Sequence, residues 1–173
     1  MIHRAALIVI KLCTLVAAGI CLHDASPAIA GSADIFQSIG PAPGKTPAQH
    51  RADIDGYTRA LEEDALDQEL TSGQRYSALY NRGFLWVVLD RYDIALRDFK
   101  TLVEGTDSKI GQMPETSLTY ALSLFWHGVC LSATGDREGG LHDIDKAIAL
   151  RPWNDDWRKI RENVARGQPP KPT

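Results

Sequence analysis

The apolar residues between positions 47 and 166 recur at intervals of three and four, which places them on one face of an α-helix. No stretch alternates apolar and polar residues between turn signals, as a half-buried β-strand would. Turn-forming and helix-breaking residues divide the pattern into successive segments. The predicted helices cover about residues 47–65, 71–89, 92–104, 114–133, 137–150 and 154–166. The pattern therefore predicts an all-α fold.

Several helix ends carry a chemical signal. Thr46 precedes a proline, and a hydroxyl residue before proline is typical of a helix N-cap. Thr71 and Gln74 fit a capping box, in which each side chain binds a free backbone N–H of the first turn. Asn154 is predicted to cap the last helix, and Gly167 to follow it in the left-handed conformation that ends many helices.

Two of the predicted helix pairs share one internal spacing. In each pair a small residue is followed after twelve positions by a second small residue, and after four more by a large apolar one. These residues are Gly83, Ala95 and Phe99 in the first pair, and Gly128, Gly140 and Ile144 in the second. Small residues let two helices approach closely, and large ones fill the space toward the next pair. The spacing therefore predicts two similar helical hairpins.

This spacing, with Pro152 eight residues after Ile144, resembles the tetratricopeptide repeat (TPR) family. Residues 57–61 look like part of the second helix of a worn preceding repeat. The resemblance implies a short TPR-like helical-hairpin solenoid over residues 47–166. It would contain two full repeats, a degenerate N-terminal half-repeat and a C-terminal capping helix, which shields the end of the stack.

The sequence departs from the family pattern at several positions. Arg82 and His127 stand where the family usually has Leu, Gly140 replaces Ala, and Asp107 stands where Pro would follow the first full unit. The two units lie 45 residues apart, from position 83 to position 128, rather than the usual spacing of about 34. A loop over residues 105–113 is predicted to hold the extra residues.

In this family, side chains from the first helix of each repeat line a groove that binds peptides. The resemblance places the following residues in a partner-binding groove: Ser77, Tyr80, Phe84, Val87, Val88, Leu122, Phe125, Val129, Ser132 and Ala133. Such a groove would be largely apolar and aromatic, which is typical of binding hot spots. Two alternatives stay open: that several of these residues belong to the core, and that the chain associates with a second copy of itself.

The N-terminus has the features of a secretory signal peptide. The apolar segment over residues 5–22 is interrupted by Lys11, and small residues stand at Ala28 and Ala30. We therefore expect residues 1–30 to be removed by cleavage after Ala30, which would place the protein in the periplasm or outside the cell. The alternative is a membrane-anchored protein that retains the apolar segment.

Composition at the two ends of the helical region predicts little folded structure. Residues 31–46 are rich in Gly, Ser, Ala and Pro and are predicted to form a flexible leader. Residues 167–173 contain three prolines and are predicted to form a disordered tail. The net charge of −3 over 173 residues argues against a nucleic-acid partner.

No catalytic, metal or cofactor pattern is found, so we do not expect an enzyme. His127 and Cys130 lie one helical turn apart, as a base and a nucleophile could, but no third group is placed to orient them. Cys130 is therefore predicted to be a buried structural thiol. His142 with Asp143 and Asp145 could suggest a metal site, but His142 and Asp143 are adjacent and point to different sides of a helix. A second acidic cluster lies earlier in the chain and is predicted to be a solvated helix face: Glu62, Glu63, Asp64, Asp67 and Glu69.

The sequence thus predicts an exported TPR-repeat protein that acts as a non-catalytic protein–protein interaction module in the cell envelope. The expected partner is a protein or peptide, and the alternative is a structural role through homo-oligomers. A thiol-dependent enzyme is the weakest of the three interpretations.

Overall fold

The computed structural model describes residues 44–67, 70–107, 110–114, 117–168 and 170. Within these residues the chain forms α-helices and no β-strand, which confirms the all-α prediction. The helices are α3 (Pro47–Asp67), α4 (Ser72–Val88), α5 (Tyr92–Glu104), α6 (Leu118–Ala133), α7 (Arg137–Leu150) and α8 (Asp155–Ala165). The predicted signal peptide and most of the predicted leader lie outside the described residues.

The chain divides into two compact units, Met1–Gly56 and Tyr57–Thr173. In the described part of the first unit, Thr46 caps the start of α3 as predicted. Its backbone N–H donates to Gln49 Oε1 at 2.7 Å, and the Gln49 N–H donates to Thr46 Oγ1 at 3.3 Å. Lys45 Nζ lies 2.7 Å from Asp53 Oδ2, so this end of the predicted leader is bonded to the helix that follows.

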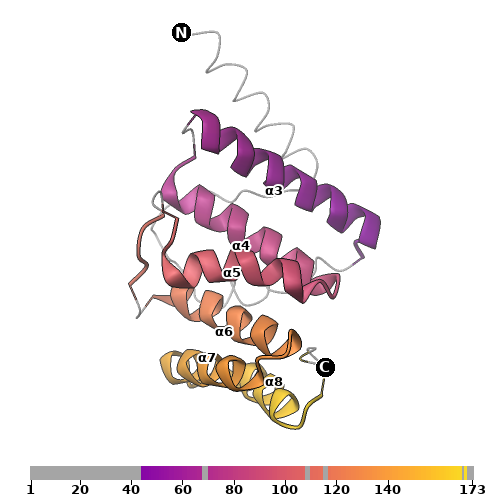
Figure 1. Ribbon diagram of the computed structural model, residues 1–173, viewed down its shortest axis with the longest axis vertical. Coiled ribbons are helices and arrows are strands. Elements are labelled where there is room, and N and C mark those ends of the chain that lie inside the picture. The colour runs from indigo at the N-terminus through magenta and orange to yellow at the C-terminus, as the bar shows by residue number, and fades with distance from the viewer. Residues whose placement is uncertain (1–43, 68–69, 108–109, 115–116, 169, 171–173) are drawn as a thin grey trace. The chain divides into compact units, whose positions relative to one another are not determined.

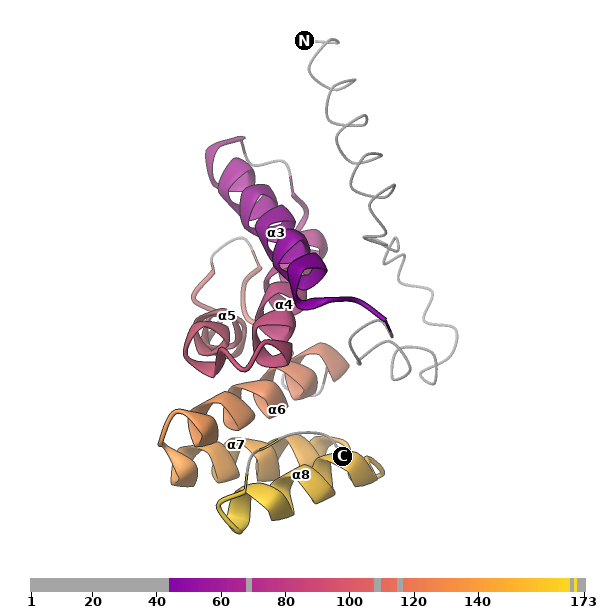
Figure 2. The ribbon, with the colours of Figure 1, turned by 90° about the vertical axis from the view of Figure 1, so that its right-hand side faces the viewer.

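In the second unit, helices α4 to α8 are stacked in chain order, and each packs on its neighbour in sequence (Figure 1). Helices α4 and α5 form one hairpin and α6 and α7 form another, and α5 packs on α6 to join them. Helix α8 lies beside α7 and also contacts α6 (Figure 2). The arrangement is a stack of helical hairpins with a single helix at its C-terminal end.

Most helix ends were predicted correctly because their caps are local. Thr71 and Gln74 form the capping box of α4, and the Asn154 side chain accepts the Trp157 N–H at 3.2 Å. Gly167 has φ +72°, and the N–H groups of Gly167 and the next residue bond back to the last turn of α8 at 3.0 and 2.9 Å. These bonds satisfy carbonyls that the helix end would otherwise leave free.

One predicted boundary is wrong. The helix that was expected to begin at Pro114 begins at Leu118. Ser117 caps it by accepting the Tyr120 N–H at 3.1 Å, while the Pro114 carbonyl accepts the Ser117 N–H in a preceding turn. A serine at the N-cap and a proline at the first helical position are both strong start signals, and here the serine sets the boundary.

The small residues lie where the two helices of each hairpin are closest. A Cβ atom added at Gly83 would lie 3.1 Å from the ring of Phe99. A Cβ atom at Gly128 would lie 2.6 Å from the carbonyl oxygen of Gly140, which is backbone and cannot rotate away. The second hairpin is therefore the more tightly packed, and this explains glycine rather than alanine at position 140.

The turns inside the two hairpins also correspond. Asp90 has φ +58° between α4 and α5, and Gly135 has φ +111° between α6 and α7. These residues are 45 positions apart, the same interval as Gly83 and Gly128. Asp90 is the one non-glycine residue in the described chain with a positive φ, and aspartate is among the residues that tolerate this conformation. The repeat therefore extends to the backbone conformation of the turns.

One further sequence prediction is corrected in part. Asp64 is not on a solvated face: it is 1% exposed, whereas Glu62 and Glu63 are exposed as predicted. The side chains of the other two acidic residues in that group lie outside the described residues. In the predicted disordered tail, Pro170 is buried. No helix among the described residues has the length and apolar character needed to span a membrane.

Candidate functional site

The structure separates the predicted groove residues into two sets. Four of them are core residues rather than groove residues, with exposures of 8% or less: Val87, Leu122, Phe125 and Val129. Those that remain partly accessible are Ser77, Tyr80, Phe84, Val88 and Ser132, together with the exposed Ala133. The family register predicts which face of a helix points to the groove, but it does not predict whether another helix lies over that face.

Phe125 shows the physical reason for this correction. Its ring stacks on Trp157 of α8, with ring centroids 4.5 Å apart and planes at 8°. Its other neighbour is Trp126, in an edge-to-face contact at 5.2 Å. Phe125 is completely buried between these contacts. The capping helix therefore covers the predicted groove position on α6.

On α4 the partly accessible residues form a strip on one helix face, which we call the α4 strip: Ser77, Tyr80, Phe84 and Val88. Tyr80 contacts Phe99 edge-on at 5.8 Å, and Phe84 contacts Trp126 at 5.2 Å. The strip therefore rests on aromatic rings from α5 and α6, which fix its side chains. Sequence reasoning missed Trp126, because only the folded chain brings it beneath this face.

The polar groups beside the strip are uncharged. Tyr76 donates its hydroxyl to the Thr119 carbonyl at 3.0 Å and lies 3.2 Å from Ser123 Oγ. The Tyr80 hydroxyl and the Trp126 indole nitrogen are buried near each other, but no hydrogen bond of normal geometry joins them. Burial raises the pKa of both tyrosines above the ordinary value of a phenol, so they remain neutral at physiological pH.

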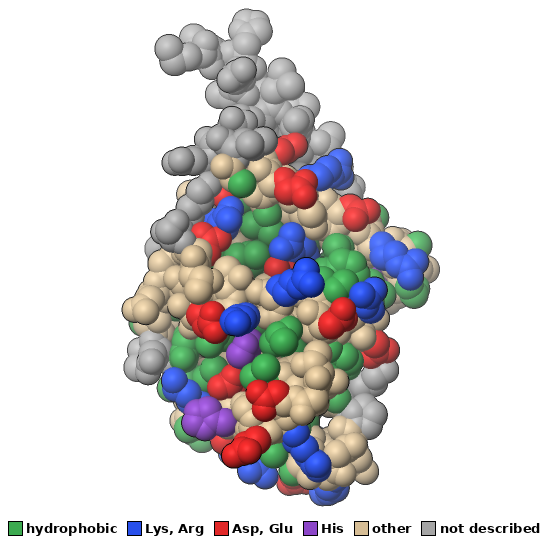
Figure 3. Space-filling view, in the orientation of Figure 1, with side chains coloured by type: hydrophobic (Ala, Val, Ile, Leu, Met, Phe, Trp, Pro, Cys, Tyr) green, Lys and Arg blue, Asp and Glu red, His purple; other side chains and the backbone are tan. Residues whose placement is uncertain are grey.

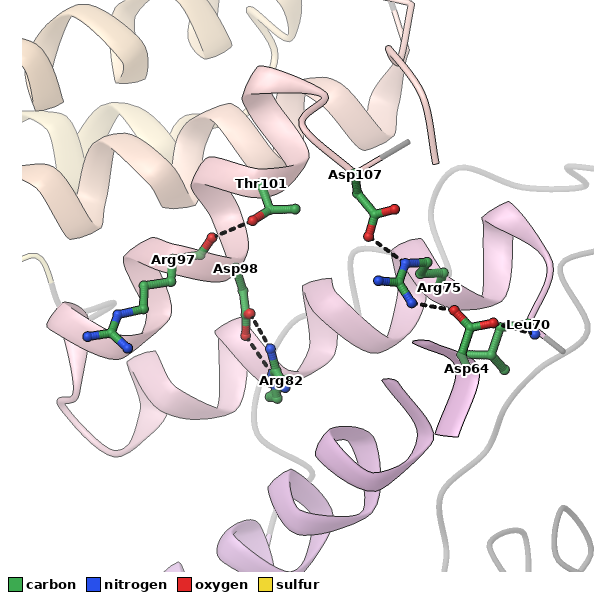
Figure 4. Close-up of polar contacts among 8 residues, drawn as sticks. All are labelled: Asp64, Leu70, Arg75, Arg82, Arg97, Asp98, Thr101 and Asp107. Carbon is green, nitrogen blue, oxygen red and sulfur yellow. Dashed lines mark hydrogen bonds and ion pairs between the residues drawn. The ribbon is translucent and has the colours of Figure 1, made fainter. Parts of the chain in front are cut away.

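Two pairs of polar side chains, each with an aspartate, occupy equivalent places in the two hairpins. Arg82 bonds Asp98 through two nitrogens at 2.9 and 2.6 Å, and His127 Nδ1 lies 2.7 Å from Asp143 Oδ2 (Arg82 and Asp98 are drawn in Figure 4). Arg82 also donates to Thr58 of α3 at 3.3 Å. The two residues that depart from the family's leucine are thus paired with carboxylates on the second helix. The sequence held this signal: a basic residue before each glycine, and an aspartate sixteen positions later.

A third charged cluster holds the end of α3 to the first hairpin. Arg75 of α4 bonds both Asp64 of α3 and Asp107 in the loop after α5 (Figure 4). Asp64 also accepts the Leu70 N–H at 2.8 Å. Burial alone would lower the pKa of Arg75, but the hydrogen bonds and charges of Asp107 and Asp64 raise it above its ordinary value. Asp107, which was predicted to stand at a position where the TPR pattern has proline, bonds Arg75 at the start of the long loop.

The possible thiol site has no reactive geometry. Cys130 is fully buried, as predicted, and burial raises the pKa of its thiol to about 12. His127 Nδ1 lies 2.7 Å from Asp143 Oδ2, and among the described residues no hydrogen bond joins its ring to the cysteine. In the same part of the chain, no group of His, Cys, Asp and Glu side chains is arranged to hold a metal ion. The His127 and Cys130 side chains are therefore part of the packing between α6 and its neighbours.

We expect Cys130 to be protected in the native mature chain. At pH 8 the thiolate that reacts with an alkylating or disulfide reagent is a minute fraction of the buried thiol. The labelling rate in the native state should be at least on the order of a thousandfold below that of the chain unfolded in guanidinium. Mass spectrometry after timed labelling measures both rates. Rapid labelling of the folded chain would contradict the burial of this side chain.

The charges on the face drawn in Figure 3 are of both signs and alternate with apolar side chains, so neither sign forms a patch there. Among the described residues, the α4 strip is a partly accessible surface without charged side chains. Comparison with known proteins adds no further constraint, because no family model, curated protein or solved structure matches the chain.

Proposed function

We propose that this chain is an exported, TPR-like helical-hairpin protein that binds a protein or peptide partner and has no catalytic activity. The observation that carries the proposal is the α4 strip, a partly accessible and uncharged aromatic surface on a stack of two equivalent hairpins. Large, rigid aromatic side chains give contact area at a small entropic cost. The apolar segment and small-residue cleavage site at the N-terminus support export.

The equivalence of the hairpins supports the TPR-like assignment. The same interval of 45 residues relates their close-contact glycines, their left-handed turn residues and the side-chain pairs Arg82–Asp98 and His127–Asp143 between their helices. Each hairpin also packs its second helix against the helix that follows, α5 on α6 and α7 on α8. In such a stack the first helices share one side, which is where the α4 strip lies.

End-to-end assembly of copies is the less favoured alternative. The buried side of α8 contains its apolar residues, and the opposite side is exposed and charged. These charges pair within the helix, as Arg158 with Asp155, Lys159 with Asp156, and Arg166 with Glu162. The exposed side of α8 is therefore a charged surface, poorly suited to stacking a second copy, although Trp153 in the turn before α8 is 66% exposed.

Site-specific photo-crosslinking tests the proposed function. A benzophenone amino acid replaces Ser77 or Val88 in the α4 strip and, as a matched control, Lys159 on the charged side of α8. Irradiation of cells that produce the full chain should give discrete cross-linked species from the two strip positions and none of the same mass from position 159. Equal products from all three positions, or none from the strip, would contradict a partner-binding role for this surface.

A further inference from the structure

Helix α8 is amphipathic and is attached by one side. Trp157, Ile160 and Val164 are 5%, 5% and 3% exposed, and they lie at intervals of three and four along one helix face. The rest of the helix is charged and solvated. A helix of this kind buries an apolar stripe when it is bound and stays soluble when it is free.

The surface beneath α8 is defined by the contacts it makes. Trp157 stacks on Phe125 of α6, and the helix packs along α7. Phe125 is also a position that the family register assigns to the partner groove. The described chain therefore fills part of its predicted binding surface with its own terminal helix.

Few other interactions hold α8 in place. Arg137 at the start of α7 donates to the Val164 carbonyl at 3.0 Å and to the Ala165 carbonyl. Arg161 pairs with Asp145 at 2.8 and 3.0 Å, but both side chains are largely solvated. The terminal element of a repeat stack contacts neighbours on one side only, and local opening begins at such elements.

We infer that the surface of α6 and α7 beneath α8 is an exchangeable docking site, whose external ligand is an amphipathic helix of the partner. That helix carries an aromatic residue and, three and seven positions after it, aliphatic residues, which is the spacing of Trp157, Ile160 and Val164 in α8. The inference rests on the proposed function and names the class of partner. Helix α8 competes with the partner from within the chain, at the high effective concentration that a short linker gives.

Binding of a peptide in trans tests this inference. The probe is a fluorescein-labelled peptide of residues 154–168, and fluorescence anisotropy measures its affinity for the mature protein. We expect weak binding to the unaltered chain and at least tenfold tighter binding to the Trp157→Ala protein, in which the competing helix is weakened but the surface on α6 and α7 is intact. A peptide that carries Trp157→Ala should lose at least tenfold in affinity. The Lys159→Ala protein should behave as the unaltered chain.

Hydrogen exchange on the unaltered protein gives a second test that does not depend on a variant folding. The α8 amides should exchange at least tenfold faster than the most protected amides of α6, because α8 opens without the rest of the stack. Equal protection of α8 and α6, or peptide binding that ignores the Trp157 substitution in either molecule, would overturn the inference. Neither result would alter cross-linking at the α4 strip, so failure here is distinguishable from failure of the proposed function.

Discussion

Gly140→Ala is expected to destabilise the protein by about 3 kcal/mol, near the upper end of the usual range for an overpacked site. An added Cβ would lie 2.5 Å from the Gly128 carbonyl oxygen and 2.8 Å from the Ser132 nitrogen. Both atoms belong to the backbone of α6, so no side chain can rotate to make room. Helices α6 and α7 would have to separate, and Ile144 and Ala147, now fully buried, would lose contacts.

Denaturant unfolding followed by circular dichroism measures this effect. Gly73→Ala is the matched control, because a Cβ atom at this position of α4 meets nothing within 4 Å. Alanine is favoured over glycine in a helix, so the control should be unchanged or more stable by about 0.5 kcal/mol. A Gly140→Ala protein as stable as the unaltered chain would show that the second hairpin is not packed through these two glycines.

Arg75→Met is expected to destabilise the protein by about 3–5 kcal/mol, as is usual when one member of a buried ion pair is removed. The substitution leaves Asp64, whose side chain is fully buried, without its guanidinium partner. Methionine has a similar length, so the loss is one of charge and hydrogen bonding more than of volume. The same change removes the guanidinium that bonds Asp107 at the start of the loop between the hairpins.

Two further variants separate this charge effect from general damage. Arg97→Met removes an arginine of α5 whose exposed guanidinium extends away from the neighbouring ion pairs (Figure 4), and it should change stability by no more than about 0.5 kcal/mol. Asp64→Asn removes the negative charge of this buried side chain while keeping an oxygen for the Leu70 N–H. Added to Arg75→Met, it should restore part of the lost stability. A double variant less stable than Arg75→Met alone would refute the charge argument.

The sequence predicted those features of the fold whose causes are local. The capping box of Thr71 and Gln74 and the cap at Asn154 lie within three or four residues of the helix starts that they set. The glycine spacing predicted close helix contact in both hairpins because a turn of three residues forces the two helices to be neighbours. The predicted start of α6 was wrong because two start signals, Pro114 and Ser117, stand close together in the sequence and the pattern does not show which one sets the boundary.

The site was predicted less well because burial is decided by residues far apart in the sequence. The register assigned Phe125 to a groove, yet its exposure depends on Trp157, which is 32 residues further along the chain. Asp64 was predicted to be solvated from its acidic neighbours, but Arg75 of α4 pairs with it, and Asp107 after α5 pairs with the same arginine. Helix periodicity predicts the direction of a side chain relative to its own helix, and only the packed chain determines what meets it there.

Helix α6 has a consequence for the chain before it folds. Its sixteen residues include no Asp, Glu, Lys or Arg, and nearly all of its residues from Tyr120 to Cys130 are buried. In an unfolded chain this segment is an uncharged, aromatic-rich stretch of the kind that drives aggregation. Variants that loosen the second hairpin should therefore lose soluble yield in a concentration-dependent way, since molecules that expose α6 associate with one another before they refold.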